Sequence, residues 1–124
     1  MADAYQMTSQ SLAYLGDCVL ELKVREYLVK HNFTHSAELN RAALSFVTAV
    51  AQSEAVKRIL PLLRKDEEEI FRRGKNSHVT PPKSATLNEY KRATGFECLL
   101  GYLHLRGETD RIEELFCAAY ADKI

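Results

Sequence analysis

Apolar residues recur every three or four positions along most of the chain, and this spacing constrains the fold more than any other feature. Such spacing places the apolar side chains of a segment on one face of an α-helix. It first occurs in residues 8–30, at Leu12, Leu15, Val19 and Leu22. Thr8 or Ser9 is a suitable N-terminal cap for this helix. No segment alternates between apolar and polar residues as a half-buried strand does, so the sequence predicts an all-α fold.

A second helical segment spans residues 36–59 and ends before a proline. Its expected inward positions are Leu39, Ala43, Phe46, Val50, Ala51 and Ile59. Ser45 marks a possible bend within the segment. Pro61 lacks an amide hydrogen and clashes with the preceding turn, so it ends or kinks the helix. We therefore expect one long, bent helix here.

Three further helices have recognisable ends. Residues 65–73 begin with acids and end with arginines, the order that the helix dipole favours, and Gly74 then indicates a stop. Residues 87–105 follow a capping box formed by Thr86 and Glu89, and Gly107 marks their end. The last helix, residues 110–121, is expected to bury Ile112, Leu115, Phe116, Ala119 and Tyr120.

Residues 75–86 form a loop of about a dozen residues that contains the adjacent Pro81 and Pro82. A loop of that length in a small protein usually has a function or is mobile. It lies between two predicted helices. We therefore treat it as a candidate functional segment.

Length and composition fit a single compact domain over residues 1–124. With 46% hydrophobic and 27% charged residues, the chain is close to the average for globular proteins. It has no apolar stretch long enough to span a membrane and no signal peptide at its start, so we expect a cytoplasmic protein. Cys18, Cys98 and Cys117 are too widely spaced for a disulfide framework or a zinc site. We expect them to be buried thiols.

The net charge is zero, yet positive charge is concentrated in one segment. Between residues 72 and 92 there are six basic residues and one acid, Glu89. This basic strip could contact a polyanion, although a solvated surface explains it equally well. The candidate contact residues in the strip are Arg72, Arg73, Lys75, Asn76, Lys83 and Lys91.

Two acids lie in unusually apolar segments, Asp17 within SLAYLGDCVL and Glu97 within ATGFECLLGYL. A carboxylate surrounded by core residues is costly to desolvate unless it is paired or bound to a metal. Asp17 could instead pair with Lys23 or Arg25, and Glu97 with a buried arginine. Each acid taken alone is therefore weak evidence of a functional site.

Glycines strengthen the case for a shared site. Gly16 precedes Asp17, and Gly101 lies one helical turn after Glu97. Glycine weakens a helix interior and is tolerated where two backbones approach closely. Two helices that cross at these glycines could bring the carboxylates together. Paired carboxylates without thiolates or clustered imidazoles suit an oxygen-preferring ion such as magnesium.

The segments LAYLGDCVLELKVREYL and YKRATGFECLLGYLHLRG resemble the two metal-binding helices of the ribonuclease III family. FRRGKNS followed by a loop with proline and lysine resembles what the Mini-III branch of that family places between them. The resemblance covers essentially the entire chain in the right order. It implies an all-α catalytic domain that acts as a homodimer and lacks a separate double-stranded RNA-binding domain.

The resemblance also implies an activity. Asp17 and Glu97 match the family's magnesium-binding aspartate and glutamate, which makes them the expected catalytic residues. The implied reaction is hydrolysis of double-stranded RNA to a 5′-phosphate and a 3′-hydroxyl, and the basic strip with Asn76 and Ser77 would contact the RNA backbone. By resemblance to bacterial Mini-III enzymes, the expected substrate is large-subunit (23S) ribosomal RNA precursor.

Three positions depart from the pattern of most ribonuclease III enzymes. Those enzymes have further acids where this chain has Gln10, Ala13 and Thr94. Mini-III proteins share these departures, so they favour that branch. They leave open whether Thr94 or another residue completes the set of metal ligands.

Other polar residues are weaker candidates for metal ligands. Glu21 lies on the same helix face as Asp17, but a surface pair with Arg25 explains it at least as well. His31 and His35 straddle a predicted helix end and are poor metal ligands. His104 is expected to pack or to contact phosphate. A different class of protein, a non-catalytic helical RNA-binding or adaptor dimer, stays open on sequence alone.

Overall fold

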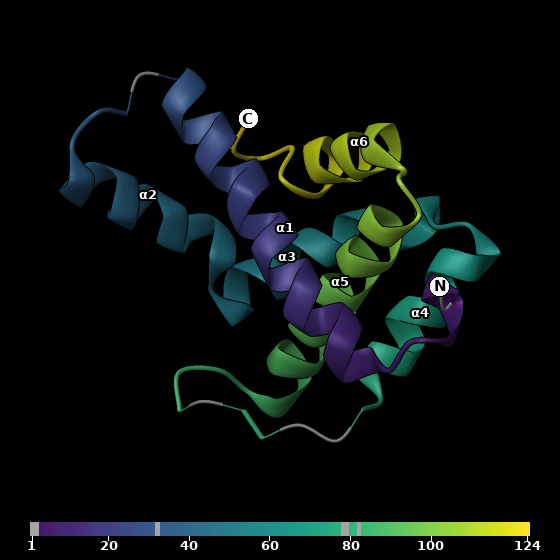
Figure 1. Ribbon diagram of the computed structural model, residues 1–124. Helices are drawn as coiled ribbons and strands as arrows, with labels where there is room; N and C mark the ends of the chain where they lie inside the picture. Colours follow the sequence, from purple (N-terminus) through teal and green to yellow (C-terminus); the bar gives the residue numbers. More distant parts are fainter. Residues whose placement is uncertain (1–2, 32, 78–79, 82) are drawn as a thin grey trace.

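The computed structural model describes residues 3–31, 33–77, 80–81 and 83–124, and Figure 1 shows their arrangement. This part of the chain contains six α-helices and two short 3-10 helices, and no strand occurs within it. In chain order they are η1 (Ala4–Gln6), α1 (Ser9–Lys30), α2 (Ser36–Val47), α3 (Ala49–Ile59), η2 (Leu60–Leu62), α4 (Lys65–Lys75), α5 (Leu87–Leu105) and α6 (Thr109–Ala119). The prediction of a single all-α domain is confirmed.

Helices α1 and α5 form the centre of the molecule. They make the most extensive contact of any two elements, and α3, α4 and α6 pack around α5 (Figure 1). In the middle of α5, every residue from 98 to 103 is buried. Phe96, Tyr102 and Tyr120 are among the largest fully buried side chains. Because α5 is enclosed on several sides, it reads as an apolar run without a polar face, as a core helix does.

Helix α1 begins where the sequence predicts. The cap is Thr8, whose hydroxyl accepts a hydrogen bond from the amide of Ser11 at 3.1 Å. Leu22 was predicted to face inward, and this is wrong because its side chain is 58% exposed. The second half of α1 packs against α2, as in the contact of the Tyr27 and Phe46 rings 5.8 Å apart. Because of that contact, the buried face of the second half of α1 differs from the predicted one, and Leu22 stays exposed.

The helix predicted over residues 36–59 is divided in two. Thr48 has an extended backbone between α2 and α3, and its hydroxyl accepts a hydrogen bond from the amide of Ala51 at 3.2 Å. The break therefore lies three residues after the bend expected at Ser45. Val50, expected inward, is 42% exposed. Helix α3 ends before Pro61, which lies in η2, and that prediction is confirmed.

Gly74 does not stop helix α4, which continues to Lys75. A Cβ atom at Gly74 would lie 2.6 Å from the Sγ atom of Cys98, so this glycine permits close contact between α4 and α5. The other predicted ends are confirmed. Thr86 and Glu89 form the capping box of α5, and Gly107 follows the helix with a φ of +72°.

All five residues predicted to face inward in the last helix are buried, four of them in α6 and the fifth, Tyr120, at its C-cap. The cysteine prediction is confirmed only for Cys98, because Cys18 and Cys117 are exposed, and all three thiols are free. Among the described residues, no helix is both long enough and apolar enough to cross a membrane.

Candidate active site

Helices α1 and α5 touch backbone to backbone at two glycines. A Cβ atom added to Gly16 would lie 1.6 Å from the carbonyl oxygen of Glu97. A Cβ atom added to Gly101 would lie 2.1 Å from the carbonyl oxygen of Leu12. No other residue type fits at either position without separating the helices. The prediction that these glycines permit a close helix crossing is confirmed.

The crossing brings the carboxyl groups of Asp17 and Glu97 close enough to interact. The pKa of Glu97 is raised to about 7, first because the carboxyl is largely buried and then because the negative charge of Asp17 lies beside it. A hydrogen bond between the two carboxyl groups raises the pKa further. Two like charges at one place cannot both be ionised without cost. The pair therefore calls for a positive charge.

The protein does not supply that charge from the described part of the chain. None of the ion pairs there includes Asp17 or Glu97. The alternative partners considered for Asp17 pair elsewhere, Lys23 with Glu113 and Arg25 with Glu21. Asp17 itself is exposed, so the expectation that its apolar neighbours bury it is wrong. Of those neighbours, Leu12, Val19 and Leu20 are buried, whereas Tyr14 and Cys18 are exposed.

Gln52 is a residue of this site that sequence reasoning missed. Its side chain is 3% exposed, and its Nε2 atom donates to the Glu97 carboxylate at 3.3 Å and to the carbonyl oxygen of Val47 at 2.9 Å. The sequence does contain a signal that Gln52 faces inward. Gln52 lies three and seven residues before the apolar positions Ala55 and Ile59, on the inward face of its helix.

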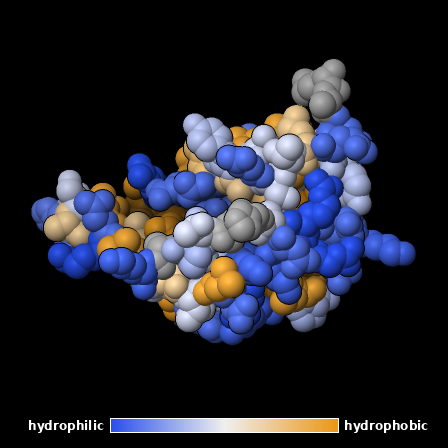
Figure 2. Space-filling view, turned by 90° about the horizontal axis from the view of Figure 1, so that it is seen from below, coloured by the Kyte–Doolittle hydropathy of each residue, from blue (hydrophilic) through white to orange (hydrophobic). Residues whose placement is uncertain are grey.

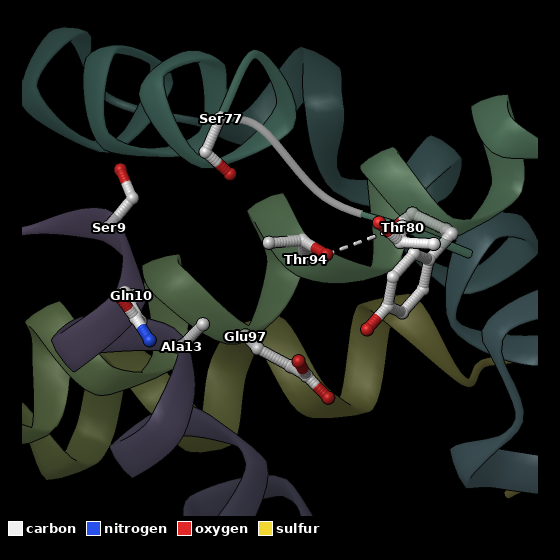
Figure 3. A pocket seen from close by; sticks show the side chains of 8 residues that line it. Ser9, Gln10, Ala13, Ser77, Thr80, Thr94 and Glu97 are labelled. Atoms are coloured by element: carbon white, nitrogen blue, oxygen red, sulfur yellow. Dashed lines mark hydrogen bonds between the residues drawn. The ribbon is translucent and has the colours of Figure 1, made fainter. Parts of the chain in front are cut away.

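A cavity of about 490 Å³ opens beside Glu97. Figure 3 shows that its walls come from the start of α1, from the segment after α4 and from α5. Its lining residues are Ser9, Gln10, Ala13, Ser77, Thr80, Tyr90, Thr94 and Glu97. Apart from Glu97 the lining carries no charge, and the Thr94 hydroxyl donates to the carbonyl oxygen of Tyr90 at 2.9 Å. The three positions that depart from the ribonuclease III pattern, Gln10, Ala13 and Thr94, all line this cavity.

Some residues of the basic strip are bonded to other groups of the protein, and others are not. Arg73 donates to the carbonyl oxygens of Tyr5 and Met7 at 2.7 and 2.8 Å, and Arg72 pairs with Glu69. Within the described part of the chain, no hydrogen bond or ion pair engages the side chains of Lys75, Asn76, Lys83 and Lys91. Figure 2 views the molecule from the side of the loop between α4 and α5, and hydrophilic residues prevail there.

The remaining candidates have structural explanations. Glu21 pairs with Arg25 at 3.1 Å, as the alternative interpretation expected. The Nδ1 atom of His31 lies 2.8 Å from the carbonyl oxygen of Tyr27, at the end of α1. His104 is exposed. No cluster of three or more His, Cys, Asp or Glu side chains capable of holding a metal occurs among the described residues.

Comparisons with known proteins cover this site and the fold around it. A sequence model of the Ribonuclease III domain matches residues 10–108, which include both acids. Mini-ribonuclease 3 of Symbiobacterium thermophilum is 39% identical over 120 residues, 96% of this chain and 92% of that protein. Mini-ribonuclease 3 of Enterococcus faecalis is 41% identical over 119 residues, 93% of this chain and 89% of that protein.

A solved structure is also similar. The crystal structure of a Fusobacterium nucleatum protein has a TM-score of 0.86 and 32% sequence identity. The matched region covers 94% of this chain and 95% of that chain. The agreement therefore extends over all six helices described here rather than over one motif.

Proposed function

This chain belongs to the ribonuclease III family, in its Mini-ribonuclease 3 branch, and is an endoribonuclease of that type; we propose that it cuts double-stranded RNA at the Asp17 and Glu97 pair with magnesium as its metal. The family resemblance stated from the sequence is thus confirmed. One observation carries the proposal for the site. A glycine crossing forces two carboxyl groups together, and no cation of the described chain balances them.

The chemistry of the pair fits a divalent, oxygen-preferring metal ion. Asp17 and Glu97 offer carboxylate oxygens, and magnesium needs only one or two carboxylates because it keeps several waters. The positions Gln10, Ala13 and Thr94 add no further carboxylate to the cavity wall. Asp17 and Glu97 would therefore hold the metal by themselves. When bound, the ion supplies an activated water and neutralises charge on the scissile phosphate.

The positions of the chain's own residues determine how the metal site is exposed and which groups surround it. Glu97 is half-buried and fixed by α5, whereas Asp17 is exposed on α1, so the pair opens toward solvent on the Asp17 side. An RNA phosphate can approach from there. The uncharged cavity beside Glu97 offers hydroxyl and amide groups. Such groups suit ribose hydroxyls, which proteins use to recognise double-stranded RNA.

The RNA backbone would lie along the basic strip. Arg72, Lys75, Asn76, Lys83 and Lys91 flank the loop that leads into α5, the helix that carries Glu97. Cations placed there would contact phosphates and position the duplex without reading its sequence. Two donors of Arg73 are already used within the protein. We therefore leave Arg73 out of the RNA-binding surface.

We further propose that the enzyme acts as a homodimer. Three large apolar side chains of α1, Tyr14, Leu22 and Val29, are 86%, 58% and 66% exposed. Their spacing of eight and seven residues places them on one side of the helix, where they form an apolar stripe that the charged Arg25 and Glu26 interrupt. Covering this stripe with the same stripe of a second copy gives a symmetric contact. Two copies would present two sites, one for each strand of the duplex.

Sedimentation tests the dimer. The parent is expected to sediment as a dimer at micromolar concentration, and Leu22→Glu is expected to shift it to monomer without unfolding it. Lys30→Glu, an exposed change at the end of α1 outside the stripe, is the control. A parent that cleaves duplex RNA yet sediments only as monomer contradicts the dimer.

The proposed physiological substrate is large-subunit ribosomal RNA precursor, in the cytoplasm. This rests on the family alone. The experiment for the activity itself is cleavage of a duplex RNA by purified protein, with magnesium and with chelator. Asp17→Asn and Glu97→Gln are each expected to lower the rate by about a thousandfold or more, which is ~4 kcal/mol of the barrier, while the helical circular dichroism stays unchanged.

The outcome separates the proposal from the other class of function. A protein that binds duplex RNA but leaves it intact under all metal conditions is a non-catalytic RNA-binding dimer. Cleavage that persists in both carboxylate variants means that the catalytic pair lies elsewhere. Cleavage in the presence of chelator would show that the reaction needs no metal ion.

A further inference from the structure

The amide of Gln52 has only one possible orientation. The carbonyl oxygen of Val47 can only accept a hydrogen bond, so the group 2.9 Å away from it must be the Nε2 atom. The same nitrogen carries a second hydrogen, and this one reaches the Glu97 carboxylate at 3.3 Å. A flipped amide would place its oxygen against both acceptors. The contact with Glu97 therefore follows from the local geometry.

The segment that carries Gln52 is held firmly. Thr48 caps the start of α3, one turn before Gln52. The next residue, Ser53, is fully buried, and its hydroxyl accepts a hydrogen bond at 2.7 Å from Arg92 of α5. Gln52 itself is 3% exposed. Because α3 is fixed to α5 at this turn, the amide has little freedom to swing away from Glu97.

The other end of the amide has no partner. The Oε1 atom of Gln52 is buried, and the described part of the chain gives it no donor. A buried acceptor without a donor costs stability, so a glutamine kept for folding alone would be a poor choice at this position. A glutamine hydrogen-bonded to the Glu97 carboxylate is a better choice if that carboxylate holds a hydrated cation, since the waters of the cation are donors.

We infer that Gln52 is a positioning residue of the metal site: it orients the Glu97 carboxylate for the ion and leaves its own oxygen as an acceptor for a donor from outside the chain. This inference rests on the proposed function. Metal-binding carboxylates are commonly hydrogen-bonded in turn by such outer groups, and loss of one typically weakens metal binding or activity by 10- to 100-fold. Gln52 acts through Glu97 and needs no contact with RNA.

The test measures metal binding directly, without RNA and without turnover. Chelator-stripped protein is titrated with Mn²⁺, and the free ion is followed by electron paramagnetic resonance. Gln52→Met keeps the length of the side chain and removes both polar atoms. It is expected to raise the Mn²⁺ dissociation constant by about 10- to 100-fold. Gln6→Met, the same substitution at an exposed glutamine of η1, is the matched control and should leave the constant within about twofold.

Cleavage assays give a second readout. In Gln52→Met the magnesium concentration for half-maximal rate should rise by a similar factor, while the rate at saturating magnesium stays within a few fold of the parent's. A variant with unchanged Mn²⁺ affinity, whatever its thermal stability, overturns the inference. If Gln52→Met fails to fold, Gln52→Asn replaces it, because its shorter amide does not reach Glu97 and the same weakening is expected.

The outcomes distinguish this inference from the proposed function. Asp17→Asn and Glu97→Gln serve as references in the same titration. If they bind Mn²⁺ as the parent does, the metal site itself is wrong. If they lose binding and Gln52→Met keeps it, only the role of Gln52 is wrong.

Discussion

Two acids of this protein, the buried Glu67 in α4 and the half-buried Glu97 in α5, have opposite surroundings. Glu67 is 0% exposed, and Arg111 donates to both of its carboxylate oxygens at 2.8 and 2.9 Å. The backbone amide of Arg64 donates to it as well, at 2.8 Å. Glu97 has one amide donor, Gln52, and faces a second acid. A charge that the fold balances serves stability, whereas a charge that the fold leaves unbalanced is available to a ligand.

The largest effect is expected at Glu67. Glu67→Ala would leave the partly buried Arg111 with only the exposed Glu114 as its ion-pair partner, and breaking a buried ion pair typically costs about 3–5 kcal/mol. Urea denaturation followed by circular dichroism measures the loss. Glu68→Ala, one residue further along α4 and exposed, should change the free energy of unfolding by about 0.5 kcal/mol or less. Similar values for the two variants would remove the distinction between balanced and surface acids.

Glu97→Gln should instead stabilise the metal-free protein. The folded-state pKa of Glu97 is about 7, above the ordinary glutamate value of 4.5. Between these pH values the unfolded chain loses the proton and the folded chain keeps it, so the parent loses stability as pH rises. The full penalty, up to about 3 kcal/mol, is present above pH 7 and absent below about pH 4.5. The variant does not have this penalty.

Urea unfolding in chelator at pH 4, 6 and 8 measures that difference. The variant should match the parent at pH 4 and exceed it increasingly at pH 6 and 8. Glu89→Gln is a useful control, because the capping hydrogen bonds with Thr86 lower the pKa of Glu89. Its pH dependence should therefore have the opposite sign. A Glu97→Gln variant that is less stable than the parent at pH 8 would show that Glu97 is already balanced within the fold.

Magnesium should stabilise the parent by a comparable or smaller amount. An ion that binds only the folded state at 100 times its dissociation constant contributes about 2.7 kcal/mol. Thermal unfolding with magnesium chloride, compared with potassium chloride at equal ionic strength, measures the effect. Asp17→Asn and Glu97→Gln should lose it and Glu67→Gln should keep it. Equal shifts in all four proteins would mean that the ion binds elsewhere.

The sequence predicted most helices because their signals are local. The Thr86 and Glu89 capping box, Pro61 and Gly107 each act within one turn, and each prediction agrees with the structure. The errors came from contacts between distant segments. Gly74 looks like a stop but packs against Cys98 of α5, and Leu22 lies on the face of α1 that the fold leaves exposed.

The same limit applies to the site. Apolar flanks drew attention to Asp17 and Glu97, yet Asp17 is exposed, and the most buried acid, Glu67, lies within the charged run KDEEE. Flanking residues show only which side chains are adjacent in the sequence, whereas the surroundings of the site are formed by α1, α3 and α5 together. Gln52 contacts Glu97 from 45 positions away in the chain. No local pattern reports that distance, although the glycines Gly16 and Gly101 did predict where the two helices cross.

The smallest effects on stability are expected in the basic strip, where the same distinction applies to cations. Lys75 and Lys83 have no partner within the described chain, whereas Arg73 bonds two backbone carbonyls. Replacing Lys75 and Lys83 by alanine should change the free energy of unfolding by about 0.5 kcal/mol or less. It should flatten the salt dependence of duplex RNA binding by roughly one unit per residue, since each phosphate contact releases counterions. Arg73→Ala should instead lower the free energy of unfolding by about 1–3 kcal/mol and leave the salt dependence of RNA binding unchanged. Binding at 50–300 mM salt and urea unfolding measure both. A double lysine variant with the parent's affinity and slope would mean that the strip is only a solvated surface.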